Sequence, residues 1–177
     1  MNKERNYLYL VLNVLMVVGM ITFMGCSEDE KEDPTPPDIV DVINATPGLS
    51  TLSSAIEIGG LSFVLKGTGP FTILAPTNDA FAELPAGVLN SLYNNPEKLS
   101  DLLLYHTLSG SFKSSEFTTG TIAPLYKRDG LIEVEANGPS VKFNGSANIV
   151  EPDNEGTNGV VQVIVEVLVP VDLEFPN

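Results

Sequence analysis

Apolar and polar residues are distributed along the chain in four different patterns. Residues 7–24 are apolar with one strongly polar interruption, Asn13, whereas residues 27–38 are charged residues, polar residues and proline. From residue 38 to about residue 107 apolar residues recur at helical spacing, and after residue 110 they form short alternating or valine-rich runs. Helices first and strands later predict an α+β domain with an antiparallel sheet.

Capping residues and prolines mark the predicted helices. Asp38 and Ser50 each precede a short amphipathic stretch, and Thr77 is placed to cap a further helix. Pro96 begins the last helix, since proline suits the first helical turn. Between these helices we expect one buried strand at residues 71–75, an apolar run flanked by prolines.

Turn pairs separate the strands predicted for the second half of the chain. Asn-Gly or Asp-Gly begins at positions 129, 137, 144 and 158, and such pairs suit tight antiparallel connections. The acidic segment 151–156 is predicted to be a loop. The strands are expected at residues 121–126, 131–135, 141–143, 149–150 and 160–169.

The first 25 residues have the pattern of a secretory signal. Two basic residues and the apolar run 7–24 precede Gly25 and Cys26. The segment 23–26 resembles the lipobox of bacterial lipoproteins, in which the cysteine becomes the lipidated first residue. We therefore predict cleavage before Cys26 and acylation of it, including palmitate, because several acyl chains give stable anchoring. The alternative is an uncleaved membrane anchor, for which the run is slightly short.

Charge limits the partners of the remaining chain. Without residues 1–25 it has 7 basic and 22 acidic residues, a formal charge of −15, which excludes nucleic acid as the natural partner. The same charge repels anionic headgroups, so the predicted membrane link is the lipid on Cys26. The predicted organisation is a signal peptide at 1–25, a disordered tether at 26–37, one domain at 38–172 and a tail at 173–177.

Three ordered motifs carry a resemblance to a known family. Residues 71–81, Phe-Thr-Ile-Leu-Ala-Pro-Thr-Asn-Asp-Ala-Phe, resemble the first signature of the fasciclin domain, and residues 158–170 resemble the second. Tyr105-His106, after a leucine-rich helix, resembles the central dipeptide of that family. The second signature usually has His at the position of Gln162 and Asp at that of Val165, so both positions are expected to lose a polar partner.

The resemblance implies a fold and a role. The fold is a fasciclin-like β-wedge or sandwich of antiparallel strands with short helices packed on it. The role is extracellular adhesion or binding through protein or cell-surface contacts, without catalysis or a cofactor. An accessory glycan-capture protein of an outer-membrane uptake system is the alternative, although the chain has no Trp to offer a sugar-stacking platform.

The sequence offers few groups for catalysis. A nucleophilic triad needs a positioned base, and His106 is the chain's one histidine. With Cys26 the one cysteine, no zinc ligand set is available, and no Gly-x-Ser-x-Gly elbow or phosphate-binding glycine loop occurs. Paired carboxylates remain open as the basis of an enzyme of unknown type.

The candidate site residues each have a structural and a functional reading. The helical stripe predicts a buried, hydrogen-bonded His106, whereas Tyr105 lies off the stripe and is expected to be more exposed, with a contact role open. Thr77 and Asn78 are read as capping and turn residues, with Asp79 in the first helical turn. The loop 151–156 resembles the start of a calcium-binding EF-hand but is followed by a strand, which favours a solvated turn over a metal site.

The residues after Cys26 bear on localisation. The run Glu28-Asp29-Glu30-Lys31-Glu32-Asp33 resembles the acidic surface-export signal of Bacteroidetes lipoproteins. A solvated spacer is the alternative, since flexibility and charge suit both. We predict an outer-membrane lipoprotein exposed at the cell surface, with an unidentified extracellular or envelope protein, or a glycan, as its partner.

Overall fold

The computed structural model describes residues 36–126, 130–171 and 173. The predicted signal peptide, Cys26, the acidic run and Asp129 of the first predicted turn lie outside these residues. No helix in the described ranges is long and apolar enough to cross a bilayer. The helices are α2 (Ile39–Ala45), α3 (Ser50–Ile58), α4 (Ser62–Leu65), α5 (Asn78–Ala82), α6 (Val88–Tyr93), α7 (Pro96–Tyr105) and the 3₁₀ turn η1 (Ser114–Glu116). The strands are β1 (Phe71–Pro76), β2 (Thr107–Ser109), β3 (Gly120–Ile122), β4 (Ile132–Asn137), β5 (Ser140–Phe143), β6 (Ala147–Gly156) and β7 (Gly159–Ile164).

Two of the predicted helix caps are present. Asp38 Oδ1 accepts hydrogen bonds from the amides of Val40 at 2.8 Å and Asp41 at 2.9 Å, and Asp41 completes a capping box. Thr77 Oγ1 accepts from the Ala80 amide at 3.1 Å, which caps α5. Ser50 is not a cap, because α3 begins at Ser50 itself.

In the described part of the chain, seven strands form one sheet in the order β2-β1-β7-β6-β5-β4-β3. The two signature strands are its parallel neighbours, with Phe71 opposite Gly159 and Pro76 opposite Ile164. The other pairs are antiparallel. The expectation of an antiparallel sheet is therefore correct for the hairpins, but the sheet is mixed. Residues 77–158 lie between β1 and β7 and include α5 to α7 and β2 to β6, so they provide the long connection that a parallel pair requires.

The acidic segment 151–156 is strand rather than loop. It forms the second half of β6, whose pairing with β7 shifts register between Ile149 and Glu151 and again between Glu151 and Asn154. Asp153 lies within this irregular stretch and adopts a left-handed φ of 61°. Extra residues of this kind bend a strand and increase its twist.

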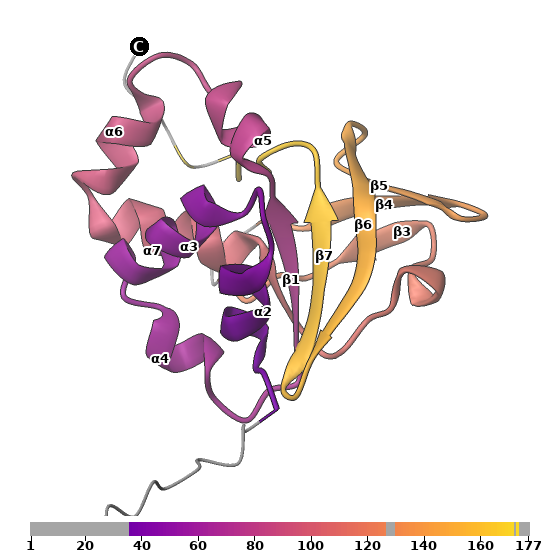
Figure 1. Ribbon diagram of the computed structural model, residues 1–177. Helices are drawn as coiled ribbons and strands as arrows, with labels where there is room; N and C mark the ends of the chain where they lie inside the picture. Colours follow the sequence, from indigo (N-terminus) through magenta and orange to yellow (C-terminus); the bar gives the residue numbers. More distant parts are fainter. Residues whose placement is uncertain (1–35, 127–129, 172, 174–177) are drawn as a thin grey trace, which may run out of the picture. The chain divides into compact units, whose positions relative to one another are not determined.

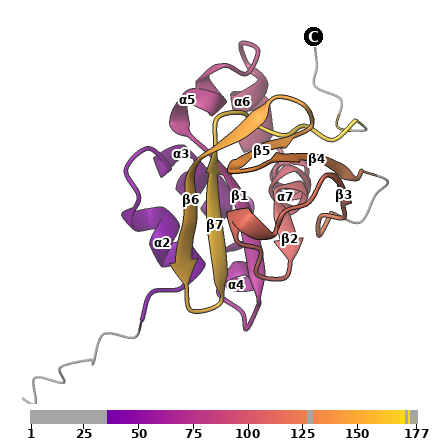
Figure 2. The same ribbon diagram turned by 90° about the vertical axis from the view of Figure 1, so that its right-hand side faces the viewer.

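The sheet has a hydrophobic cluster on each face. In Figure 1 the helices α2 to α7 lie on one side of β1 and β7, and β3, β4 and β5 lie on the other. Ile73 of β1 and Val161 of β7 pack against the helices, whereas Leu74 of β1 and Ile164 of β7 pack against β4 and β5, including Phe143. Figure 2 shows β4 and β5 beside the start of β6, where β5 pairs with it. The α+β wedge expected from the sequence is confirmed.

Candidate functional site

The residues after β1 connect two helices. Asn78 Oδ1 accepts a hydrogen bond from the Thr51 amide at 2.8 Å, and its Nδ2 donates to Ser50 Oγ at 3.0 Å. Asn78 thus supplies from α5 the cap that α3 lacks in its own sequence. Asp79 is exposed in the first turn of α5. Thr77 and Asn78 therefore have defined structural partners.

Tyr105 and His106 lie inside the domain. Tyr105 is 3% exposed, so the expectation that it is more exposed than the stripe of α7 is wrong. Its hydroxyl donates to the Leu131 carbonyl at 3.2 Å and accepts from Asn144 Nδ2 at 3.3 Å, and its ring packs edge-on against Tyr126. The helical spacing missed this burial because β4 and β5, distant in sequence, cover the ring.

Both ring nitrogens of His106 are bonded to the backbone. Nδ1 donates to the Leu102 carbonyl at 2.8 Å, and Nε2 accepts from the Leu168 amide at 2.9 Å. Burial lowers the pKa of His106 to about 4, against which the bond to Leu102 acts only in part. His106 is neutral at pH 7 and holds the segment after β7 against the end of α7, so it is not available as a general base.

A buried polar network surrounds Gln162. Gln162 Nε2 donates to the Phe112 carbonyl at 3.0 Å and to Asp153 Oδ1 at 2.8 Å, while its Oε1 accepts from the Asp153 amide at 3.0 Å. Ser114 donates to both Asp153 oxygens, from its amide at 2.7 Å and from its hydroxyl at 2.8 Å. The expected loss of a polar partner at Gln162 is therefore wrong.

The electrostatics of Asp153 follow from this network. Burial on its own would raise the pKa of Asp153, but the hydrogen bonds from Gln162 and Ser114 outweigh it and lower the pKa. The carboxylate is thus ionised and already bonded to protein donors. In the part of the chain that is described, no group of three His, Cys, Asp or Glu side chains is arranged to hold a metal ion.

Asn158 forms a second junction, at the turn between β6 and β7. Its Oδ1 accepts from the Ile39 amide at 3.0 Å, and its Nδ2 donates to the carbonyls of Leu65 at 2.7 Å and Gly67 at 2.8 Å. One side chain therefore joins the hairpin, the start of α2 and the end of α4. The Asn-Gly pair predicted the turn, but not these partners.

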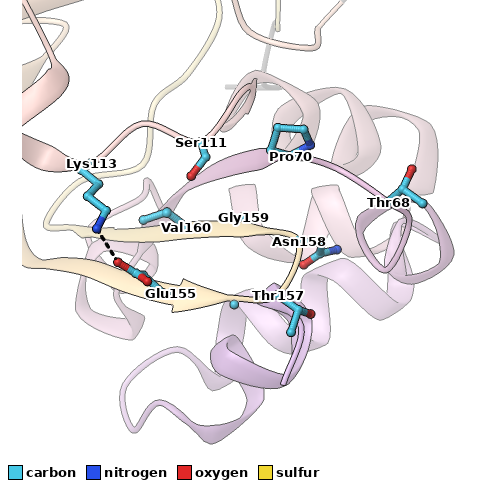
Figure 3. Close-up of a pocket in the computed structure, with 10 residues that line it drawn as sticks. Thr68, Pro70, Ser111, Lys113, Glu155, Thr157, Asn158, Gly159 and Val160 are labelled. Carbon is cyan, nitrogen blue, oxygen red and sulfur yellow. Dashed lines mark ion pairs between the residues drawn. The ribbon is translucent and has the colours of Figure 1, made fainter. Parts of the chain in front are cut away.

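A pocket of about 280 Å³ opens beside this junction (Figure 3). Its wall includes the ion pair of Lys113 and Glu155, whose Nζ and Oε1 atoms are 2.7 Å apart. Nothing in the sequence singled out this pair. The remaining lining residues are Thr68, Pro70, Ser111, Gly156, Thr157, Asn158, Gly159 and Val160.

The chemistry of the pocket is that of polar binding. Hydroxyl groups, backbone groups and one ion pair line it, but neither a histidine nor an aromatic ring does. None of Thr77, Asn78, Asp79, Tyr105 and His106 lies in its lining. The pocket can therefore accept hydrogen-bonding groups of a partner.

The three sequence motifs meet in the sheet. β1 and β7 belong to the two signatures and pair along their whole length. The Leu74 amide donates to the His106 carbonyl at 2.8 Å, and the Leu168 amide donates to the His106 ring. The motifs therefore form the structural centre of the domain.

Comparison with known proteins identifies the family. The fasciclin-domain model matches residues 47–170, and the chain belongs to this family. Over 134 residues it is 37% identical to the protein sll1483 of Synechocystis, covering 75% of this chain and 73% of that protein. It is 35% identical to transforming growth factor-beta-induced protein ig-h3 of Sus scrofa over 75% of this chain but only 19% of that protein. The FAS1 domain pair of the insect cell adhesion molecule fasciclin I matches 77% of this chain and 52% of that chain, with a TM-score of 0.65 and 16% identity.

Proposed function

We propose that this chain is a lipid-anchored extracytoplasmic module that binds another protein or a cell surface. The observation that carries the proposal is its membership of the fasciclin-domain family. One protein with this fold is an insect cell adhesion molecule. The signal-like residues 7–24 and Cys26 support export and anchoring, with an outer-membrane location at the cell surface.

The chemistry of the described residues favours binding over catalysis. The one histidine is buried, with both nitrogens bonded to the backbone. A protein partner is favoured over a glycan, because the lining of the pocket beside Asn158 offers hydrogen bonds without an aromatic platform for a sugar ring.

Anchoring is tested by the intact mass of the membrane-bound form. The expected mature protein begins at Cys26 and carries acyl mass, and Cys26→Ala leaves it unprocessed or released. A different mature N-terminus, or a membrane form without acyl mass, would contradict the anchor.

Binding is tested by photo-cross-linking of the full chain in its native envelope. A photoreactive residue replaces Ser111 at the pocket, and a matched variant carries it at the half-exposed Val150. A discrete protein adduct at either position, identified by mass spectrometry, supports a protein-binding module. Adducts with lipid or glycan alone, or no adducts at all, would contradict it.

A further inference from the structure

Exposed apolar side chains gather on the short helix α4. Phe63 is 90% exposed and Val64 is 46% exposed, whereas Leu65 of the same helix is 1% exposed. Ile58, the last residue of the preceding helix α3, is 41% exposed. Leu65 thus fixes α4 to the domain while Phe63 and Val64 remain in solvent, where their burial against an apolar medium would be favourable.

This helix lies at the end of the domain where the chain enters from the predicted tether. Lys66 Nζ, directly after α4, is 3.2 Å from Asp41 Oδ1 and 3.6 Å from Asp38 Oδ2. Asn158 bonds both to the Leu65 carbonyl and to the Ile39 amide. Figure 1 shows α4 beside the start of α2. The apolar side chains are therefore close to the first described residues.

The length of the preceding chain limits how far this end lies from the membrane. Ten residue steps separate Cys26 from Pro36, at most about 35 Å of extended chain. The limit also applies if the apolar run 7–24 stays uncleaved, because the chain then leaves the bilayer near residue 25. A short tether gives a high effective concentration, so even a weak contact is populated.

The charges near α4 limit which part of a membrane this end of the domain can contact. Its ionisable neighbours Lys66, Asp38 and Asp41 carry a net negative charge, and Glu57 on α3 adds to it. Attraction to anionic headgroups is therefore excluded as the driving force. Apolar residues, including phenylalanine, are the groups that interfacial helices bury at the boundary between headgroups and acyl chains.

We propose that Phe63 and Val64 form a membrane-contact site by which the anchored domain places its α4 end on the bilayer. The proposal rests on the anchoring proposed above. The contact fixes the orientation of the domain, because it supplies a second point of attachment beside the tether. It also places the pocket beside Asn158, at the same end of the molecule, toward the membrane.

The chain has no tryptophan, so a single substitution introduces a unique fluorophore. The lipidated full chain with Phe63→Trp is reconstituted in phosphatidylcholine vesicles with or without brominated acyl chains. The control is Val171→Trp, which is similarly exposed at 92% and follows the opposite end of β7 from the Asn158 turn. We expect bromine to reduce the emission of Phe63→Trp at least about twofold and that of Val171→Trp much less, because only the former reaches the acyl boundary.

Flotation of the same vesicles separates the two proposals. If Phe63→Trp floats with the vesicles and its emission is quenched no more than that of Val171→Trp, the contact proposal fails and anchoring stands. If neither variant floats, anchoring fails and the contact site fails with it. If the Phe63→Trp emission is shifted to the blue but is not quenched by bromine, the residue is buried against a second copy of this chain, the one protein surface present, and the membrane contact is equally overturned. Equal unfolding temperatures of the two variants exclude a folding defect.

Discussion

At the scale of single residues, the interior polar groups are matched by protein partners. The described residues contain no buried side-chain nitrogen or oxygen without a hydrogen-bond partner. His106 and Gln162, 2% and 0% exposed, each bond to segments distant in sequence. Removing one partner of such a group costs its desolvation energy, so these two positions should contribute strongly to the stability of the domain.

The first prediction concerns the pH dependence of stability through His106. Its pKa is about 4 in the folded chain and near 6.5 when unfolded, so the unfolded state binds more protons between these values. The stability from the neutral ring is complete above pH 6.5 and decreases as the pH falls, by about 3 kcal/mol at pH 4. Urea unfolding between pH 7 and pH 4.5 measures this slope.

The matched variant for this prediction is His106→Gln, which keeps a donor and an acceptor but does not titrate. It should lose stability at pH 7, because its bonds to Leu102 and Leu168 are poorer, and it should be less dependent on pH than the native chain over this range. The same slope in both proteins would show that another group carries the pH dependence. Asp153 changes the free energy of unfolding only at lower pH than His106 does, because its pKa in the folded chain is lowered.

The second prediction concerns Gln162. Replacing it with Glu places a carboxylate at the position that is 2.8 Å from Asp153 Oδ1 and 3.0 Å from the Phe112 carbonyl. A buried carboxylate at position 162 and the half-buried Asp153 beside it cannot both ionise easily, so Gln162→Glu should lower the free energy of unfolding at pH 7 by about 3 kcal/mol or more. The deficit should decrease toward pH 5 as the introduced carboxylate takes a proton.

The comparison variant is Gln162→Met, which removes the bonds without adding charge. Its loss of stability, about 2 kcal/mol, should not change between pH 7 and pH 5. Parallel pH profiles of the two variants, measured by urea unfolding, would mean that the charge of Asp153 is screened from position 162.

At the scale of secondary-structure elements, asparagine side chains join helices and turns by hydrogen bonds and so supplement their apolar packing. Asn78 caps α3 from α5, and Asn158 joins α2, α4 and the hairpin of β6 and β7. Both helices α4 and α5 are too short to be stable by themselves. Their positions therefore depend on these cross-links as well as on buried apolar residues.

The third prediction compares two asparagines of one hairpin. Asn158→Ala removes three short bonds, to Ile39, Leu65 and Gly67, and should lower the free energy of unfolding by about 2–3 kcal/mol. Asn154→Ala removes two long ones, at 3.3 and 3.5 Å, and should cost less than about 1 kcal/mol. Chemical denaturation gives both values, and equal losses would refute a connecting role for Asn158.

Elements with local signals were predictable, and elements that depend on distant partners were not. The caps at Asp38 and Thr77 and the buried strand β1 follow from neighbouring residues. The short strand β2, by contrast, is defined by its pairing with β1, and the parallel register of β1 and β7 depends on segments about 88 residues apart. The acidic half of β6 has no apolar alternation, and its partner β7 imposes the strand.

The residues of the candidate site also divide into those predictable from local sequence and those that depend on distant partners. A stripe of apolar residues on α7 predicted the buried His106, but Tyr105 is covered by strands that the helix itself cannot reveal. The pair of Lys113 and Glu155 and the partners of Asn158 join segments more than forty residues apart. Charged and amide residues are common in loops. Only the folded structure therefore distinguishes Lys113, Glu155 and Asn158, which have defined partners, from similar residues that contact only solvent.

At the scale of the whole molecule, the pocket lies at the same end of the domain as the first described residues. Asn158 lines the pocket and also bonds to Ile39, three residues after Pro36. A partner that uses the pocket must therefore approach the end of the domain at which the described residues begin. On the proposed outer-membrane location, a partner from another cell requires the domain at the cell surface, and a partner from within the envelope requires it in the periplasm.

The fourth prediction concerns this location and the acidic run after Cys26. An export signal requires its charges next to the lipid, whereas a spacer requires only length and flexibility. The run is therefore neutralised at constant length, keeping Cys26, by Ala in place of Glu28, Asp29, Glu30, Glu32 and Asp33. Protease added to intact cells should degrade the native domain and spare the variant, with both forms equally lipidated by intact mass.

A second variant controls for charge alone in this experiment. It moves the same acidic residues toward Pro34, so that composition and length stay constant while the charges leave the lipid. If the run is a position-dependent export signal, the domain of this variant should also be spared by protease. If the run is a spacer, the domain of this variant should be degraded like the native one. Equal protease accessibility of all three forms would reduce the run to a spacer. Protection of all three would place the domain in the periplasm, and adhesion between cells would then be untenable, because a domain held beneath the outer membrane cannot reach another cell.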